Sequence, residues 1–116
     1  MRIAFTTKGT DWNAMMDPRF GRTDYFLLYD EEFNQLKSLD NRTIGEDAHG
    51  AGPKTVQTLS ELQPDVLITG NGPGRNAIRA LEVMNVKIYV GAGKMTAGEA
   101  FEAYKNNVLH EFVIPD

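Results

Sequence analysis

Cysteine is absent from the 116-residue sequence, which excludes disulfide bonds, thiolate metal sites and cysteine nucleophiles. The sequence also lacks an apolar run long enough to span a bilayer. Its beginning shows no charged region followed by an apolar stretch and a cleavage site. The twelve lysines and arginines are scattered along a chain of formal net charge −4, so no basic patch for nucleic acid is indicated. These absences predict a cytoplasmic protein that binds neither membranes nor nucleic acid.

Strands and helices alternate along the chain. Short β-branched and aromatic runs predict strands, and apolar residues three or four positions apart predict helices. The predicted strands cover residues 2–7, 24–30, 65–69 and 86–90, and a short edge strand is expected in the tail to residue 116. The predicted helices cover residues 53–63, 75–84 and a segment that begins with the capping-box pair Thr96 and Glu99.

Residues 31–42 admit two interpretations. Phe33, Leu36 and Leu39 are three positions apart, which is a helical spacing. The segment is short and poorly capped, however, and a turn followed by an antiparallel strand fits it equally well.

This order of elements predicts a single domain over residues 1–116, with three α/β/α layers and a mixed sheet. An antiparallel meander continues through right-handed crossovers into parallel strands. The N-termini of all three helices then lie at one end of the sheet, and His110 is expected at the opposite end. Four loops share the end with the helix N-termini, namely residues 8–22, 42–52, 70–74 and 91–95.

This end of the sheet carries the candidate binding site. Helix N-termini favour anions because their N–H groups are unpaired and carry partial positive charge. Ligands of open α/β sheets lie beyond the carboxyl ends of the strands. Arginines pair with oxyanions, and glycines let the backbone approach a ligand. The predicted site residues are Arg19, Arg22, His49, Gly50, Gly52, Asn71, Gly72, Gly74 and Arg75.

Each of these residues also has a purely structural interpretation. The glycines suit tight turns between strands and helices, and His49 suits a hydrogen bond within its loop. The two arginines Arg19 and Arg22 suit ion pairs with Asp17 and Asp24. Three large apolar residues of the first loop suit either the core or a soft rim of the site, namely Trp12, Met15 and Met16.

Several motifs follow one another in order over nearly the whole chain. They are Met1-Arg2-Ile3-Ala4, Arg19-Phe20-Gly21-Arg22 before Tyr25-Phe26, Asn41, Gly50-Ala51-Gly52, Asp65-Val66-Leu67-Ile68-Thr69-Gly70 leading to Gly72-Pro73, and Val86-Lys87-Ile88-Tyr89. Together they resemble the dinitrogenase iron–molybdenum cofactor biosynthesis family, in particular its short stand-alone members. The resemblance implies a ribonuclease-H-like α/β/α fold. It also implies a small carrier that holds an iron–sulfur–molybdenum cluster or its precursor during nitrogenase assembly.

One position departs from the resemblance. The nitrogenase carriers have histidine, the expected ligand type of the cluster, where this chain has Arg19. Arginine does not lose its proton in proteins and therefore cannot ligate iron or molybdenum. Because cysteine is absent, the inner-sphere ligands reduce to His49 and to Met15 or Met16. An iron–sulfur or iron–molybdenum cluster could still be held electrostatically, as could phosphate, molybdate or a phosphorylated metabolite.

The sequence therefore predicts a non-catalytic carrier or sensor of an anionic metallocluster or oxyanion, with other cluster-assembly proteins as partners. The alternative is a small regulatory module that binds a phosphometabolite, or a protein-interaction module that uses Met15 and Met16. A hydrolase is the least favoured class. Residues 3–7 carry no carboxylates for a two-metal site, and the hydroxyls of Thr6 and Thr7 have no neighbouring base in the sequence.

Overall fold

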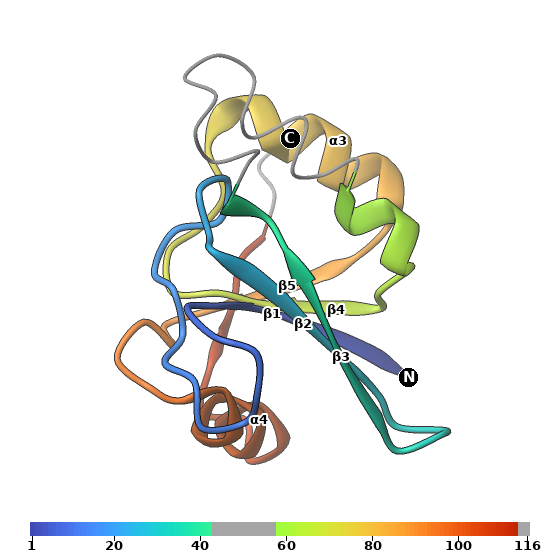
Figure 1. The fold of residues 1–116 in the computed structure, drawn as a ribbon. Helices are drawn as coiled ribbons and strands as arrows, with labels where there is room; N and C mark the ends of the chain where they lie inside the picture. The colour runs from blue at the N-terminus through green and yellow to red at the C-terminus, as the bar shows by residue number, and fades with distance from the viewer. Residues whose placement is uncertain (43–57, 114–116) are drawn as a thin grey trace.

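The computed structural model describes residues 1–42 and 58–113, apart from the side chains of Arg75, Asn76 and Ala80. In these ranges, six strands form one sheet in the order β3-β2-β1-β4-β5-β6 (Figure 1). The strands are β1 (Arg2–Thr7), β2 (Tyr25–Asp30), β3 (Gln35–Asp40), β4 (Val66–Ile68), β5 (Lys87–Val90) and β6 (His110–Glu111).

The sheet is mixed. The meander of β1, β2 and β3 is antiparallel, whereas β1, β4 and β5 are parallel to one another. The short edge strand β6 is antiparallel to β5. The α/β fold with a mixed sheet, predicted from the sequence, is thus confirmed. As a result the carboxyl ends of β1, β4 and β5 lie at the same end of the sheet.

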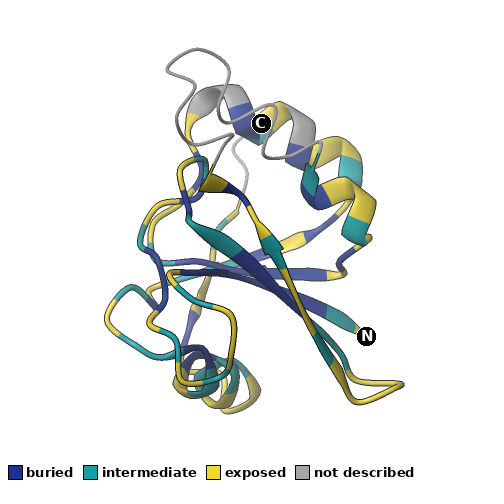
Figure 2. Cartoon of the chain, viewed as in Figure 1, coloured by how far each residue is buried: buried dark blue, intermediate teal, exposed yellow. Residues whose placement is uncertain are grey.

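Helices cover both faces of the sheet (Figure 1). The helical residues 58–62 and α3 (Arg75–Met84) pack on one face, and α4 (Ala97–Lys105) packs on the other. Because side chains alternate along a strand, β2 contributes Phe26 and Leu28 to the first core and Leu27 to the second. Figure 2 shows the buried positions along the strands and on the helix surfaces that meet them. Among the described residues, no helix combines the length and apolar character that crossing a lipid bilayer requires.

Residues 31–42 form a hairpin arm rather than a helix. Residues 31–34 make the turn between β2 and β3, and Asn34 takes a left-handed conformation there with φ of 49°. The Asp30 carboxylate accepts hydrogen bonds from the amides of Glu32 and Phe33, at 3.0 and 3.4 Å. Leu36 and Leu39 then pack on opposite faces of the sheet. The two leucines are three positions apart, a spacing that also suits a helix. In a strand, residues an odd number of positions apart point to opposite faces of the sheet, so the two leucines reach the two different cores.

The first loop packs against the sheet. Trp12 contacts the rings of Phe5, Tyr29 and Phe101 at centroid distances of 5.2–5.6 Å. Met16 is buried, whereas the side chain of Met15 remains 45% exposed. Of the two interpretations of these residues, the core is therefore correct for Trp12 and Met16, and only Met15 lies at the surface.

The boundaries of most elements agree with the sequence within one residue. Helix α3 has the predicted range, and α4 begins after the N-cap Thr96 with the predicted capping box. Of the predicted helix at 53–63, residues 58–63 are described, and they are helical from 58 to 62, with Gln63 left-handed at φ of 51°. The expected place of His110 is wrong. This residue pairs with Val90 at the carboxyl end of β5, because β6 runs back along that strand.

Candidate functional site

Three loops meet at the carboxyl ends of the parallel strands. The amide of Asn71, after β4, donates to the Pro18 carbonyl at 2.8 Å, and the amide of Gly91, after β5, donates to the Gly70 carbonyl at 3.0 Å. The amide of Met16 donates to the Met95 carbonyl at 2.8 Å. The turn before β2 therefore lies directly beside the loops that follow β4 and β5. This is the arrangement expected from the order of elements.

A cleft of about 460 Å³ opens where these loops meet. It lies at a point of divergence in the topology, since β4 leads to α3 on one face of the sheet and β5 leads to α4 on the other. Open α/β sheets bind ligands at such points, beyond the carboxyl ends of the strands. The lining residues are Pro18, Gly70, Asn71, Gly91, Gly93, Lys94 and Met95.

Close backbone packing forms the base of this cleft. A Cβ atom on Gly70 would lie 2.5 Å from the Cα of Pro18 and 2.9 Å from the Cα of Gly93. Both neighbours are backbone atoms, which cannot move aside as a side chain can. Gly91 has φ of +102°, a conformation that residues with a Cβ rarely adopt. The glycines at 70 and 91 therefore have a structural requirement that is local to the cleft.

Replacing Gly70 by serine is expected to lower the free energy of unfolding by about 2 kcal/mol, because the new side chain overpacks fixed backbone. Gly74→Ser is the matched control. A Cβ on Gly74 meets no atom within 4 Å, and serine is a preferred N-cap residue. Urea denaturation of both variants measures the difference. Equal stability of the two variants would contradict the close packing at Gly70.

The turn after β5 contributes Gly93 and Lys94, which carry hydrogen-bond donors, to the lining of the cleft. The amides of Gly93 and Lys94 donate to no acceptor in the part of the chain that the structure describes. Nor does the exposed ammonium of Lys94 form an ion pair with the described residues. Consecutive backbone N–H groups beside a cation make a favourable environment for an anion. The carbonyls of Pro18 and Gly70, in contrast, already accept hydrogen bonds from the amides described above.

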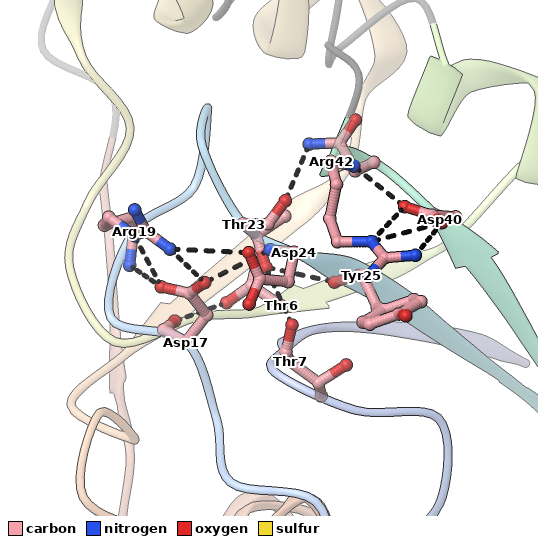
Figure 3. A network of polar contacts seen from close by, with 10 residues as sticks. Thr6, Thr7, Asp17, Arg19, Thr23, Asp24, Tyr25, Asp40 and Arg42 are labelled. Carbon is pink, nitrogen blue, oxygen red and sulfur yellow. Dashed lines mark hydrogen bonds and ion pairs between the residues drawn. The ribbon is translucent and has the colours of Figure 1, made fainter. Parts of the chain in front are cut away.

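The turn before β2 is organised around the carboxylate of Asp17, which has no solvent exposure (Figure 3). Its two oxygens accept from Nε and Nη2 of Arg19 at 3.0 and 2.9 Å, and from the Arg19 amide at 3.0 Å. The amide of Asp24 adds a fourth hydrogen bond at 3.2 Å. Burial raises the pKa of Asp17, but the hydrogen bonds and the charge of Arg19 outweigh that effect and hold the pKa below its ordinary value. Asp17 and Arg19 are therefore a charged pair.

Hydroxyl groups continue this network below the cleft. Thr6 donates through Oγ1 to the Asp17 carbonyl at 2.9 Å, and its Oγ1 lies 2.9 Å from Oγ1 of Thr69. Both threonines are buried. On the other side, the buried amide of Asn41 donates to the Thr23 carbonyl at 3.0 Å. These contacts tie the turn to β1, β4 and the end of β3.

The structure places the predicted site residues unequally. Asn71 lines the cleft, and Arg19 follows the lining residue Pro18 but directs its guanidinium to Asp17. Arg22 is exposed in the same turn and is not among the described lining residues. Gly72 lies under the ring of Phe112, and Gly74 is the N-cap of α3. Arg75 begins α3, and its side chain lies outside the described part, as do residues His49, Gly50 and Gly52.

Of the helix N-termini expected to attract anions, that of α4 already has internal partners. Thr96 and Glu99 form a reciprocal capping box. The amides of Ala97 and Gly98 donate to the carbonyls of Ala14 and Trp12, at 2.8 and 2.9 Å. The N-terminus of α3, in contrast, has no side-chain hydrogen bond from its N-cap residue. Lys94, one turn before α4, lines the cleft and is a cationic residue that the site predicted from the sequence did not include.

A metal site made by protein side chains is not found among the described residues. No group of three or more histidine or carboxylate side chains gathers there, and the whole sequence lacks cysteine. The softest atom at the cleft is the thioether sulfur of Met95. Whether His49 ligates a metal stays a prediction, since it lies outside the described residues.

Comparisons with known proteins agree with this fold. The orange protein from Desulfovibrio gigas, solved in its apo form, is 29% identical, with a TM-score of 0.90 over 99% of this chain and 95% of that one. A Thermotoga protein described provisionally as NifB is 38% identical, with a TM-score of 0.81 over 95% of this chain and 91% of that one. No curated protein matches the sequence. The family described as dinitrogenase iron-molybdenum cofactor matches residues 1–107, and the chain belongs to this family.

Proposed function

We propose that this protein is a non-catalytic carrier or sensor of an anionic metallocluster of the iron–sulfur–molybdenum type, or of an oxyanion, bound in the cleft beyond β4 and β5. The observation that carries this proposal is the turn at Gly93 and Lys94. Two amide donors and one ammonium, without internal partners among the described residues, belong to residues that line a cleft at the divergence of the sheet. Membership of the family supports a cluster of iron and molybdenum as the cargo.

The described lining suits a cargo that brings its own metal ligands. Amide N–H groups and an ammonium stabilise the negative charge of sulfide or oxide atoms, and none of them replaces a ligand on a metal. The side-chain amide of Asn71 adds a donor that makes no hydrogen bond with the described residues. The cargo is therefore held from outside by its charge and shape, which suits a protein that must later release it.

We also propose that the protein is not an enzyme. The two hydroxyls considered as nucleophiles toward a phosphoester are buried and already hydrogen-bonded. Thr6 contacts Asp17 and Thr69, and Thr7 donates to the Gly9 carbonyl at 2.8 Å. The strand order supports the finer assignment of the chain to the ribonuclease-H-like folds. Strand β1, however, lacks the carboxylates that a ribonuclease-H-like nuclease needs there. A cytoplasmic location and cluster-assembly proteins as partners complete the proposal.

An anaerobic titration tests this function. Amide chemical shifts of the protein are followed while an iron–sulfur–molybdenum cluster, molybdate and phosphate are added in turn. We expect saturable shifts at Asn71, Gly93 and Lys94, with the strongest binding for the ligand class that the protein carries. Saturation with shifts confined to the opposite end of the sheet, or no shift with any of the three, would exclude a carrier site in this cleft.

A further inference from the structure

The ring of Phe112 packs on the loop that forms one wall of the cleft. A Cβ atom on Gly72 would lie 2.6 Å from Cε2 and 2.9 Å from Cδ2 of this ring. The ring thus occupies the space that a side chain at position 72 would take. Gly72 immediately follows Asn71, which lines the cleft, so the ring lies against the back of the binding wall.

Phe112 is itself held firmly. Its amide donates to the Ile88 carbonyl at 2.7 Å, which continues the pairing of β6 with β5 by one residue. Its side chain packs against the core that lies between the sheet and α3. A ring with a fixed backbone and a fixed core contact can set the position of the loop that it touches.

The wall has two further supports, at Asn71 and Gly70. The Asn71 amide donates to the Pro18 carbonyl, and Gly70 packs on the backbone of Pro18 and Gly93. Helix α3, which follows the loop, receives no side-chain hydrogen bond from its N-cap Gly74. Packing rather than side-chain capping therefore orients the loop between β4 and α3, with Pro18 in contact at Gly70 and Phe112 in contact at Gly72.

We propose that Phe112 is a positioning residue of the binding cleft, which holds Gly72 and thereby the donor groups of Asn71 in place for an anionic ligand. The ligand in this inference comes from the proposed function. The contact between Phe112 and Gly72 does not depend on that function. The family match ends at residue 107, so Phe112 belongs to a segment that this match does not cover.

The test compares Phe112→Ala and Phe112→Leu with Val113→Ala, a neighbouring control whose side chain is 76% exposed. In the ligand-free proteins, we expect Phe112→Ala to speed hydrogen exchange of the Asn71 amide, which donates to Pro18, and to leave exchange of the Ala97 and Gly98 amides unchanged. Exchange is compared rather than chemical shift, because loss of the ring alone shifts nearby signals. We expect Phe112→Leu, which keeps an apolar contact, to restore most of the wild-type protection. The affinity for molybdate should fall three- to tenfold in Phe112→Ala and stay within twofold in Val113→Ala.

Unchanged exchange of the Asn71 amide in Phe112→Ala would overturn the positioning role, as would equally faster exchange throughout the chain. A normal affinity despite faster exchange at Asn71 would also overturn it. If wild-type protein binds neither molybdate nor phosphate nor cluster, the proposed function fails. Hydrogen exchange in the ligand-free proteins still decides whether Phe112 holds the loop.

Discussion

Asp17→Asn is expected to lower the free energy of unfolding by about 3 kcal/mol and the melting temperature by about 10 °C. The Asp17 carboxylate is fully buried and accepts four hydrogen bonds from N–H groups of Arg19 and Asp24. Asparagine keeps the shape but places an NH₂ group where one acceptor oxygen was, so that donor faces donor. The estimate lies at the low end for a broken buried ion pair because Arg19 is half exposed and can be rehydrated.

Asp11→Asn is the matched control, since it makes the same chemical change in the same loop. Asp11 is exposed, and its carboxylate accepts one hydrogen bond within the loop, from the Asn13 amide at 2.9 Å. Thermal and urea denaturation should show a change below 0.5 kcal/mol for this control. A similar loss in both variants would mean that the buried network contributes little.

The pH dependence of the Asp17 effect has a definite sign. The pKa of Asp17 is lower in the folded protein than in the unfolded chain, so its contribution is fully present above the ordinary carboxyl pKa of about 3.9. That contribution is lost as the pH falls through the lowered value. The stability difference between wild type and Asp17→Asn should therefore stay constant from pH 8 to pH 5 and narrow below about pH 4. A difference that narrows already near pH 6 would contradict the lowered pKa.

The Asp17–Arg19 pair also shows which part of the site the sequence could reveal. The two residues lie two positions apart in a polar turn. From the sequence alone, Arg19 could either pair with Asp17 or bind an anion. The structure shows the ion pair, whose burial at Asp17 depends on Thr6, on β1, and on the turn that β4 supports through Asn71. These contacts join residues far apart in the chain, which periodicity and local propensity do not describe.

Local signals, in contrast, predicted the elements well. The capping box of Thr96 and Glu99 marked the start of α4, and the apolar spacing of residues 75–84 gave the range of α3. The sequence did not decide between a helix and a hairpin for residues 31–42. The spacing of Leu36 and Leu39 fits the apolar face of a helix and also fits the two opposite faces of a strand. Lys94 carries no local signal at all. Its role in the proposed site rests on its place in the cleft beside the loop after β4, although the topology had already put residues 91–95 at that end.

Lys94→Gln is expected to weaken the binding of a divalent oxyanion or of the cluster about tenfold at low ionic strength, without a change in stability. A hydrogen bond to a charged group contributes about 1.5–3 kcal/mol, and 1.4 kcal/mol corresponds to a tenfold change in affinity. Lys94 has no carboxylate among the described residues to neutralise it, whereas Arg19 is already paired with Asp17. On the proposed function, we therefore expect Lys94 to contribute more than the paired Arg19 to the attraction of an anion.

Lys87→Gln separates this local effect from the net charge of the protein. Lys87 begins β5 and Lys94 follows the end of the same strand, so the two variants make the same change at opposite ends of the sheet. Titrations with molybdate and phosphate at several salt concentrations should give a tenfold loss for Lys94→Gln and less than twofold for Lys87→Gln. The two should converge as salt screens the charge. Equal losses of affinity in both variants would mean that the overall charge of the protein attracts the anion. The cleft would then have no specific role in binding.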